Sequence, residues 1–202
     1  MPGKKVYAAI YEDKSVTYFN NWPLCQKSVS GKSNVLFKGF KSREEAESWV
    51  KSNTKSAPPL SSNTIRIYVD GSYDVKCPKA GWGWIAVKNG EKVAEAYGTT
   101  AHDALSRNID GELEAAFLAA KWAFSQGVTA VIVHDYSGIA QWANGNWKAK
   151  SQVAIQYLKN ITPLKNNICF EKVEGHSGDI WNDCADELAK QGIVDWKKKN
   201  KR

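Results

Sequence analysis

The sequence lacks long hydrophobic runs and closely spaced cysteines. No run in its 202 residues approaches the roughly eighteen apolar residues that span a bilayer, and the opening Met-Pro-Gly-Lys-Lys has no apolar signal segment. We therefore expect a globular, cytoplasmic protein. The cysteines form none of the close pairs that zinc sites or disulfide scaffolds use, which indicates reduced thiols. They are Cys25, Cys77, Cys169 and Cys184.

The net charge of +7 is distributed unevenly along the chain. Residues 1–55 carry a net charge of +5, residues 56–196 a net charge of −3, and residues 197–202 five basic side chains with no acidic one. A slightly acidic middle region is a poor surface for nucleic acid, but it suits a domain that gathers carboxylates around cations while basic neighbours hold phosphate. For the basic C-terminal tail, residues 195–202, an effect on solubility alone is an equal alternative.

Residues 52–63 divide the chain into two regions. This stretch is rich in Ser, Asn and Pro and has no hydrophobic periodicity, which predicts a linker. Residues 1–51 predict a small α+β module in which a three-stranded sheet packs on one helix that begins near Ser42. At about fifty residues such a module is marginally stable, so its aromatic side chains must first serve the core. The expected strands are Val6–Ile10, Val16–Phe19 and Val35–Phe37.

Residues 64–194 predict an α/β domain. Three strands come first, and Asn89-Gly90 between the last two is a strong hairpin signal because both positions need positive φ. A helix and a continuous apolar strand follow, which is typical of a buried parallel strand reached by a helical crossover. The expected architecture is a five-stranded mixed sheet with helices on both faces. The expected elements are strands Ile65–Asp70, Gly83–Val87, Lys92–Tyr97, Val128–Val133 and Ile168–Val173, and helices Gly111–Gln126, Gly138–Ala143, Ser151–Ile161 and Asn182–Gln191.

Four acidic residues lie at or near the ends of these elements. Asp70 and Asp135 each end a strand, so they would project from one edge of the sheet if the two strands are parallel neighbours. Glu112 and Asp186, both in expected helices, would complete a ring of four carboxylates. Such a cluster must be partly protonated or hold cations, and hard oxygen ligands select Mg²⁺ or Mn²⁺. Two such ions about 4 Å apart clamp the attacking and leaving oxygens of a phosphoryl displacement.

Each of these acids taken singly has a simpler explanation. An acidic residue at a strand end is usually a turn former, Glu112 suits the positive end of a helix dipole, and Asp186 suits a solvated helix face. These alternatives stay open for each residue alone. The order and spacing of the four residues together favour the cluster.

The same residues lie in five motifs that resemble the type-one ribonuclease H family. The resemblance covers about residues 64–192, and it is specific because the motifs occur in the right order on the right elements. It implies a ribonuclease H-like fold and an endonuclease that cuts the RNA strand of RNA–DNA hybrids, leaves 5′-phosphomonoesters and uses two Mg²⁺ or Mn²⁺ ions. The motifs are Tyr-Val-Asp70-Gly-Ser, Asn108-Ile-Asp-Gly-Glu112-Leu-Glu-Ala-Ala, His-Asp135-Tyr-Ser-Gly-Ile, Val-Glu-Gly-His176-Ser-Gly-Asp and Asn182-Asp-Cys-Ala-Asp186-Glu-Leu-Ala.

The resemblance assigns catalytic roles to five residues. It implies that His176, on a glycine-flanked loop, helps proton transfer or product departure. The alternative for His176 is an ordinary surface-loop residue, which its Gly and Ser neighbours alone would favour. The implied metal ligands are Asp70, Glu112, Asp135 and Asp186.

The resemblance also points to residues that bind the substrate. Discrimination of RNA from DNA must involve the 2′-hydroxyl, and Gly71, Ser72 and Asn108 occupy the family positions for this contact. Trp142 and Trp147 resemble aromatic residues that line the channel for the DNA strand. For both tryptophans a place in the core is an equal alternative.

Residues 4–50 resemble the hybrid-binding domain, which is also known from viroplasmin-like proteins. The resemblance implies that an exposed Trp22 and Phe37 pack on the DNA strand and that Lys38 meets phosphate. Gly39 departs from the second lysine often found there, and Phe40 is assigned to the core. The implied partner is an RNA–DNA hybrid, with double-stranded RNA as a further ligand of this module and no obligate protein partner. The motifs are Tyr7-Ala-Ala-Ile, Tyr18-Phe-Asn-Asn-Trp22, Phe37-Lys38-Gly-Phe40 and Ser42-Arg-Glu-Glu-Ala-Glu-Ser-Trp.

The catalytic region departs from familiar bacterial members of the family in two places. The chain between Asp135 and Trp142 is about one helical turn shorter, and the segment after Trp147 lacks their basic protruding helix. We therefore hypothesise that the N-terminal module replaces this lost grip on the substrate.

Two other functions remain as alternatives. One is another nuclease of the same fold, such as an exonuclease or a strand-transfer enzyme. Against the exonuclease, Asp70 is followed by Gly-Ser and not by the second acid of an Asp-x-Glu pair. The other alternative is a non-catalytic binding adaptor. The presence of all four carboxylates argues against it.

Overall fold

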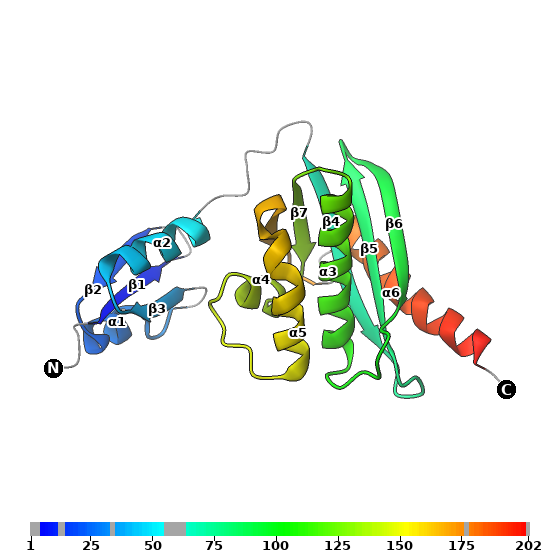
Figure 1. Ribbon diagram of the computed structural model, residues 1–202, viewed down its shortest axis with the longest axis horizontal. Coiled ribbons are helices and arrows are strands. Elements are labelled where there is room, and N and C mark those ends of the chain that lie inside the picture. Colours follow the sequence, from blue (N-terminus) through cyan, green and yellow to red (C-terminus); the bar gives the residue numbers. More distant parts are fainter. Residues whose placement is uncertain (1–4, 12–14, 33–34, 55–63, 176–177, 201–202) are drawn as a thin grey trace. The chain divides into compact units, whose positions relative to one another are not determined.

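A computed structural model gives the three-dimensional structure of the chain (Figure 1). It describes residues 5–11, 15–32, 35–54, 64–175 and 178–200. The chain divides into two compact units, Met1–Ser56 and Ala57–Arg202, and each unit contains its own β-sheet. None of the helices in these described stretches is long and apolar enough to cross a bilayer.

The N-terminal unit is a three-stranded antiparallel sheet with a helix on each face. Because side chains alternate along a strand, Ala8 and Ile10 share a core with α2, whereas Ala9 shares a separate core with α1. The strand order is β2-β1-β3, so β3 is an edge strand. The elements are β1 (Val6–Ile10), β2 (Val16–Phe19), α1 (Trp22–Val29), β3 (Leu36–Phe40) and α2 (Arg43–Thr54).

Helix α1 is the element of this unit that the sequence pattern did not predict, so the expectation of a single helix was wrong. Asn21 caps α1, since its side chain accepts a 3.0 Å hydrogen bond from the Leu24 N–H, and Pro23 lies in the first turn. The helix has only eight residues and buries two of them, which is too short for a clear hydrophobic period. The helix expected near Ser42 is confirmed as α2, where Ser42 accepts a hydrogen bond from the Glu45 N–H.

The larger unit contains a five-stranded mixed sheet in the order β6-β5-β4-β7-β8. Strands β4, β5 and β6 pair in antiparallel fashion, β7 is parallel to β4, and β8 is parallel to β7. The turn between β5 and β6 has positive φ at Asn89 (54°) and Gly90 (80°), which confirms the predicted hairpin. The strands are β4 (Ile65–Tyr73), β5 (Ala80–Lys88), β6 (Glu91–Thr99), β7 (Ala130–His134) and β8 (Ile168–Lys172).

Helices cover both faces of this sheet (Figure 1). On one face, Leu113 of α3 and Tyr157 of α5 share the main core with Ile67 of β4. On the other face, Ala185 of α6 packs in a second core that includes Val131 of β7. The predicted α/β architecture is therefore confirmed. The helices are α3 (Asn108–Ser125), α4 (Gly138–Ala143), α5 (Gln152–Ile161) and α6 (Ile180–Lys199), with a 3-10 helix η1 (Thr162–Asn167) after α5.

Helix α6 is longer than the sequence predicted. It is capped by Asp179 and continues through Lys199, so most of the predicted basic tail, residues 195–202, is helical. Lysines in the last turn complement the partial negative charge of the helix end, and Lys197 also binds Asp74 in the β4–β5 connection. These charge interactions stabilise the last turn, and the buried residues Gly192 and Ile193 stabilise the helix just beyond its predicted end at Gln191.

Candidate active site

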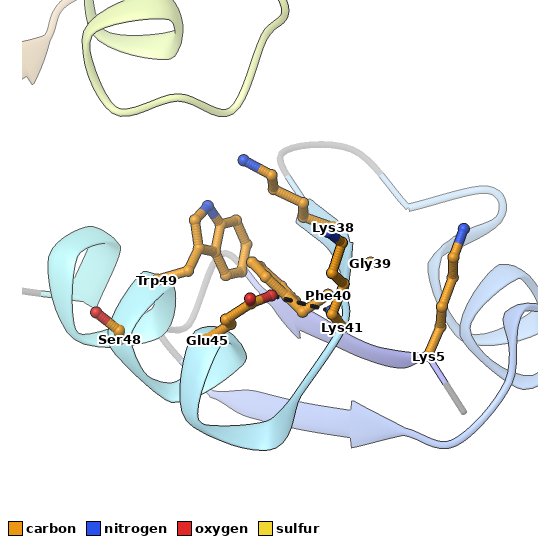
Figure 2. Close-up of a pocket in the computed structure, with 8 residues that line it drawn as sticks. All are labelled: Lys5, Lys38, Gly39, Phe40, Lys41, Glu45, Ser48 and Trp49. Atoms are coloured by element: carbon orange, nitrogen blue, oxygen red, sulfur yellow. Dashed lines mark hydrogen bonds between the residues drawn. The ribbon is translucent and has the colours of Figure 1, made fainter. Parts of the chain in front are cut away.

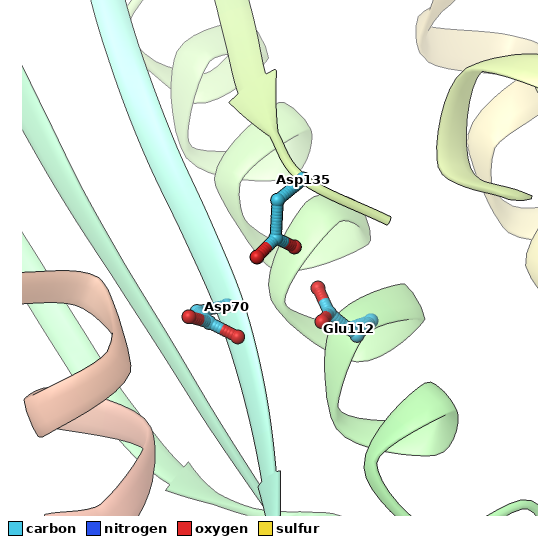
Figure 3. Close-up of side chains that lie close together, drawn as sticks. All are labelled: Asp70, Glu112 and Asp135. Atoms are coloured by element: carbon cyan, nitrogen blue, oxygen red, sulfur yellow. The ribbon is translucent and has the colours of Figure 1, made fainter. Parts of the chain in front are cut away.

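Three carboxylates from distant parts of the chain meet at one edge of the larger sheet (Figure 3). Asp70 belongs to β4, Glu112 to α3, and Asp135 directly follows β7. One oxygen atom of each carboxylate lies within 4.8 Å of an oxygen atom of the other two. Because β4 and β7 are parallel neighbours, Asp70 lies beside the C-terminal end of β7, which Asp135 directly follows. The expectation that Asp70 ends its strand was wrong, since β4 continues to Tyr73 through its pairing with β5.

Glycines bring α3 close enough for Glu112 to join the two aspartates. A Cβ atom added to Gly71 would lie 2.2 Å from the backbone nitrogen of Glu112, and one added to Gly111 would lie 2.0 Å from the backbone oxygen of Gly81. No side chain fits in either space, so the backbone of α3 rests directly on β4 and β5. The glycines therefore set the distance between the carboxylate on the helix and those on the strands.

The carboxylates of this cluster are buried and repel one another. Burial and the charge of Asp135 raise the pKa of Asp70 to about 7, although a 2.6 Å hydrogen bond from the Gly71 N–H opposes this shift. Burial and the charges of the two aspartates also raise the pKa of Glu112 well above its usual range. Burial lowers the pKa of the adjacent His134 to about 4, so its imidazole adds no positive charge. The cluster therefore needs protons or a cation near neutral pH.

The donor set of the cluster fits a divalent metal ion. Oε2 of Glu112 is buried and has no hydrogen-bond partner among the described residues. Carboxylate oxygens are the ligands that Mg²⁺ and Mn²⁺ prefer, and a cation would offset the mutual repulsion of the three groups. In the described part of the chain, no other group of three His, Cys, Asp or Glu residues has this geometry.

Asp186, on α6, stands apart from the three-carboxylate group. Its Oδ2 forms a 2.6 Å ion pair with Nζ of Lys190, one helical turn further along α6. Its charge still contributes to the raised pKa of Asp70, so the two carboxylates are close enough to interact. The structure therefore brings together three of the four predicted metal ligands and leaves the fourth paired with a lysine within electrostatic range.

His176 lies outside the described residues, and its role stays a prediction. The residue before it is described, and a Cβ atom added to Gly175 would lie 2.7 Å from Oδ2 of Asp135. The chain directly before His176 therefore lies against the carboxylate cluster.

The residues predicted to recognise the RNA sugar lie beside this cluster. Gly71 and Ser72 follow Asp70 in β4, and Asn108 is the first residue of α3. A Cβ atom added to Gly71 would lie 2.5 Å from the backbone oxygen of Asn108, so the strand and the helix start are in direct contact. The side chain of Asn108 is exposed and that of Ser72 is half-buried. Polar groups are therefore available to a ligand next to the carboxylates.

Trp142 and Trp147 form an aromatic pair with ring centroids 5.8 Å apart. Trp142 is half-buried, packs against the main core and lies 6.0 Å from the ring of Tyr136. Trp147 is 45% exposed. A core role therefore fits Trp142, whereas Trp147 presents its ring to solvent.

An aromatic platform, made of Tyr7, Trp22 and Phe37, lies on the N-terminal sheet. The ring of Trp22 is 5.7 Å from each of the other two rings. Trp22 is 38% exposed and Phe37 is 46% exposed, so both rings are open to a ligand. Phe40 instead lies 5.4 Å from Trp49 in the core beneath α2, as predicted.

Two residues of these sites were not recognised from the sequence. Lys190 holds Asp186, and the only signal for this pair was its i,i+4 spacing on a helix. Tyr7 joins the platform because it lies opposite Gly39 in the β1–β3 pair. That relation depends on strand register, which the alternation of one strand does not specify.

The fold places the larger unit in a known structural class. RNase H1 from the archaeon Halobacterium salinarum NRC-1 superposes with a TM-score of 0.57 and 22% sequence identity, over 66% of this chain and 99% of that chain. LC11-RNase H1, whose structure was solved in complex with an RNA/DNA hybrid, superposes with a TM-score of 0.57 and 21% identity, over 66% and 99% of the two chains. The class is the ribonuclease H fold, as the sequence resemblance implied.

Sequence comparison identifies the family within that class. Residues 62–194 match the RNase H family model, and residues 7–50 match the model of the Ribonuclease H1 N-terminal domain. A Ribonuclease H from Syntrophomonas wolfei is 30% identical over 139 residues, which cover 64% of this chain and 95% of that relative. The chain belongs to the RNase H family and carries a ribonuclease H1 N-terminal domain before the catalytic region.

Proposed function

We propose that this protein is an endonuclease that hydrolyses the RNA strand of RNA–DNA hybrids and leaves 5′-phosphomonoesters. The main support for this proposal is the buried cluster of Asp70, Glu112 and Asp135 in a chain of the RNase H family. Relatives named Ribonuclease H, and a structural neighbour solved with an RNA/DNA hybrid, support this substrate. A non-catalytic adaptor would have no use for three buried carboxylates that repel one another and cost stability.

The catalytic groups are proposed to act around a metal centre of two Mg²⁺ or Mn²⁺ ions. When bound, such ions activate water and stabilise the charge that develops on the phosphate. The Gly71 N–H orients the Asp70 carboxylate, and Lys190 pairs with Asp186. His176 is proposed to transfer a proton or aid product departure. The proposed metal ligands are Asp70, Glu112, Asp135 and Asp186.

Recognition of the RNA sugar is the proposed task of Gly71, Ser72 and Asn108. They lie next to the carboxylates, and a protein distinguishes RNA from DNA through contacts to the 2′-hydroxyl. Trp147 is the proposed contact for the DNA strand, because its ring is exposed. Trp142 would support it from the core side.

The N-terminal module, residues 1–51, is proposed to bind the duplex that the catalytic domain cleaves. Residues 52–63 link the module to the catalytic domain, residues 64–194. Its exposed rings, Trp22 and Phe37, suit packing against nucleotides, and Lys38 suits phosphate. The match of residues 7–50 to the Ribonuclease H1 N-terminal domain supports this role. Double-stranded RNA is a further proposed ligand of the module.

A panel of labelled substrates tests the proposed reaction. The full chain is incubated with RNA–DNA hybrid, double-stranded RNA, double-stranded DNA and each single strand, with Mg²⁺, with Mn²⁺ and with a chelator. We expect internal cuts in the RNA of the hybrid alone, only with metal, and a 5′-phosphate on the downstream fragment. Cleavage of DNA, stepwise removal of terminal nucleotides or full activity in chelator would overturn the proposal.

A further inference from the structure

An open pocket of about 650 Å³ lies at the end of β3 in the N-terminal unit (Figure 2). Three lysines, Lys5, Lys38 and Lys41, line it together with Phe40 and Trp49. Glu45 is the one acidic residue in its lining, and the carboxylate of Glu45 accepts a 3.0 Å hydrogen bond from the backbone N–H of Lys41. The pocket therefore has a net positive charge next to two aromatic side chains.

Strand pairing brings two of these lysines together. Val6 of β1 pairs with Phe40 of β3 in antiparallel register, so Lys5 and Lys41 occupy the next position outward on each strand. Both side chains are exposed, and neither forms an ion pair with a described residue. β3 is an edge strand, so no further strand of the sheet covers the pocket. The charges of both lysines are therefore available to a ligand.

The Tyr7 ring of the aromatic platform leaves no room for a side chain at position 39, which lies between Phe37 and Lys41. Gly39 lies opposite Tyr7, and a Cβ atom added to Gly39 would lie 2.8 Å from Cε1 of the Tyr7 ring. That ring packs at 5.7 Å on Trp22, so a larger residue at position 39 would disturb the platform. After Gly39, the next residue that carries a positive charge is therefore Lys41, which directly follows β3.

We propose that Lys5 and Lys41 bind a backbone phosphate of the duplex that the aromatic platform holds, which makes this pocket a second phosphate subsite. The inference rests on the proposed binding of hybrid by the module. Lys41 is four residues from Phe37, or about 13 Å along an extended strand, which corresponds to about four nucleotide steps along a duplex axis. A duplex whose axis runs along β3 would therefore contact the platform and the subsite in succession. An open pocket suits a phosphodiester of a long polymer, and such a contact adds affinity without sequence preference.

Hybrid binding measured against salt concentration tests the subsite. The full chain is titrated in chelator, so that no cleavage occurs, with Lys5→Gln/Lys41→Gln as the test variant. The control, Lys27→Gln/Lys51→Gln, removes the same charge from exposed positions in α1 and α2. We expect the test variant to lose about tenfold in affinity and to flatten the slope of log affinity against log salt by about 0.9, the contribution of one phosphate contact. The control should keep the wild-type slope.

Two results would overturn the subsite: an unchanged slope in the test variant, or an equal change in the control. A third variant, Trp22→Ala, separates this failure from failure of the proposed function. Loss of binding in Trp22→Ala with none in the lysine variant rejects the subsite alone. Wild-type binding in both variants rejects hybrid binding by the module, and the subsite with it. Matching thermal melts of all variants exclude unfolding as the cause.

Discussion

The two sheets of this chain carry opposite charges in opposite settings. In the larger unit, Asp70 and Glu112 are buried at a sheet edge, where desolvation and mutual repulsion raise the pKa of both carboxyl groups. In the N-terminal unit, Lys5 and Lys41 stay exposed beside open aromatic rings. Buried negative charge needs a cation to be stable, whereas water already stabilises the exposed lysines. The comparison teaches that this chain separates buried negative charge, which a cation can stabilise, from exposed positive charge, which is open to a polyanionic ligand.

The largest expected effect comes from removing one charge of the buried cluster. Asp135→Asn keeps the size of the side chain but removes its negative charge, so hybrid cleavage should fall by more than about 100-fold while hybrid binding changes little. Single-turnover cleavage and a binding titration measure the two quantities. Asp183→Asn, at an exposed position of α6, is the control and should cleave normally. Near-normal metal-dependent cleavage by Asp135→Asn would remove this residue from the ligand set.

The next largest loss of cleavage rate is expected from disturbing the contact between α3 and the sheet, because this contact sets the geometry of the buried cluster. In Gly111→Ala the new Cβ atom would lie 2.0 Å from the backbone oxygen of Gly81, so the start of α3 must move and carry Glu112 with it. A displacement of about 1 Å at catalytic groups costs on the order of 100-fold in rate. Lys121→Gly, later in α3, should weaken the helix by about 1 kcal/mol without moving its start.

Cleavage below the melting temperature of each variant separates these two causes. Equal losses of rate in Gly111→Ala and Lys121→Gly would show that helix stability, and not the position of Glu112, controls the reaction. A loss in Gly111→Ala alone supports the role of the close contact.

Removing the N-terminal unit should have a smaller effect than either change in the buried cluster. Deletion of residues 1–55 should weaken hybrid binding about tenfold and flatten its salt dependence, because the lysines and the aromatic platform are lost together. The cleavage rate at saturating substrate should stay close to that of the full chain. An unchanged affinity and salt slope would show that the catalytic domain holds the substrate without the module.

The smallest expected effect is on the stability of the metal-free protein. The pKa of Asp70 is raised from 3.8 to about 7, so its contribution to folding stability is present below about pH 4 and is lost as the pH rises through about 7. In chelator, the melting temperature should therefore fall by a few degrees between about pH 5 and about pH 7.5. Mg²⁺ should reverse this fall at the higher pH and have little effect at the lower one.

Asp70→Asn provides the control for this titration. The variant carries no titrating carboxyl at position 70, so the fall in its melting temperature between the two pH values should be smaller. A fall as large as that of the wild-type chain would show that other groups, and not Asp70, cause the pH dependence.

Local sequence patterns predicted most of the fold because they encode local structure. Asn89-Gly90 adopts the positive φ values that a tight hairpin needs, the predicted Gly138–Ala143 helix has the same bounds as α4, and Ser151 caps α5. Prediction failed for helices whose stability comes from tertiary contacts or charge and not from a local hydrophobic pattern. Helix α1 is too short to show a hydrophobic period. Helix α6 is extended by the burial of Gly192 and Ile193 and then by the charges of its last turn up to Lys199.

The candidate site was predicted as a set of residues but not as a geometry. Asp70 and Asp135 were expected close together because both were expected to end strands. Parallel pairing of β4 with β7 brings them together, although β4 continues past Asp70 to Tyr73. The pairing of Asp186 with Lys190 was not expected, because both a solvated helix face and a metal ligand suit the same helical position. A choice between these environments requires the neighbours of α6.

The sequence by itself determined which chemical groups the protein has and which element carries each of them, because hydrophobic period, turn residues and motif order are local properties. The tertiary structure alone decided how far apart those groups lie. Three carboxylates come within 4.8 Å because glycine contacts, at Gly71 and Gly111, let a helix rest on a sheet. Tyr7 covers Gly39, and Lys5 and Lys41 flank the Val6–Phe40 pair, because two strands pair in one register. Close backbone approach and register are relations between distant segments, and no local pattern encodes them.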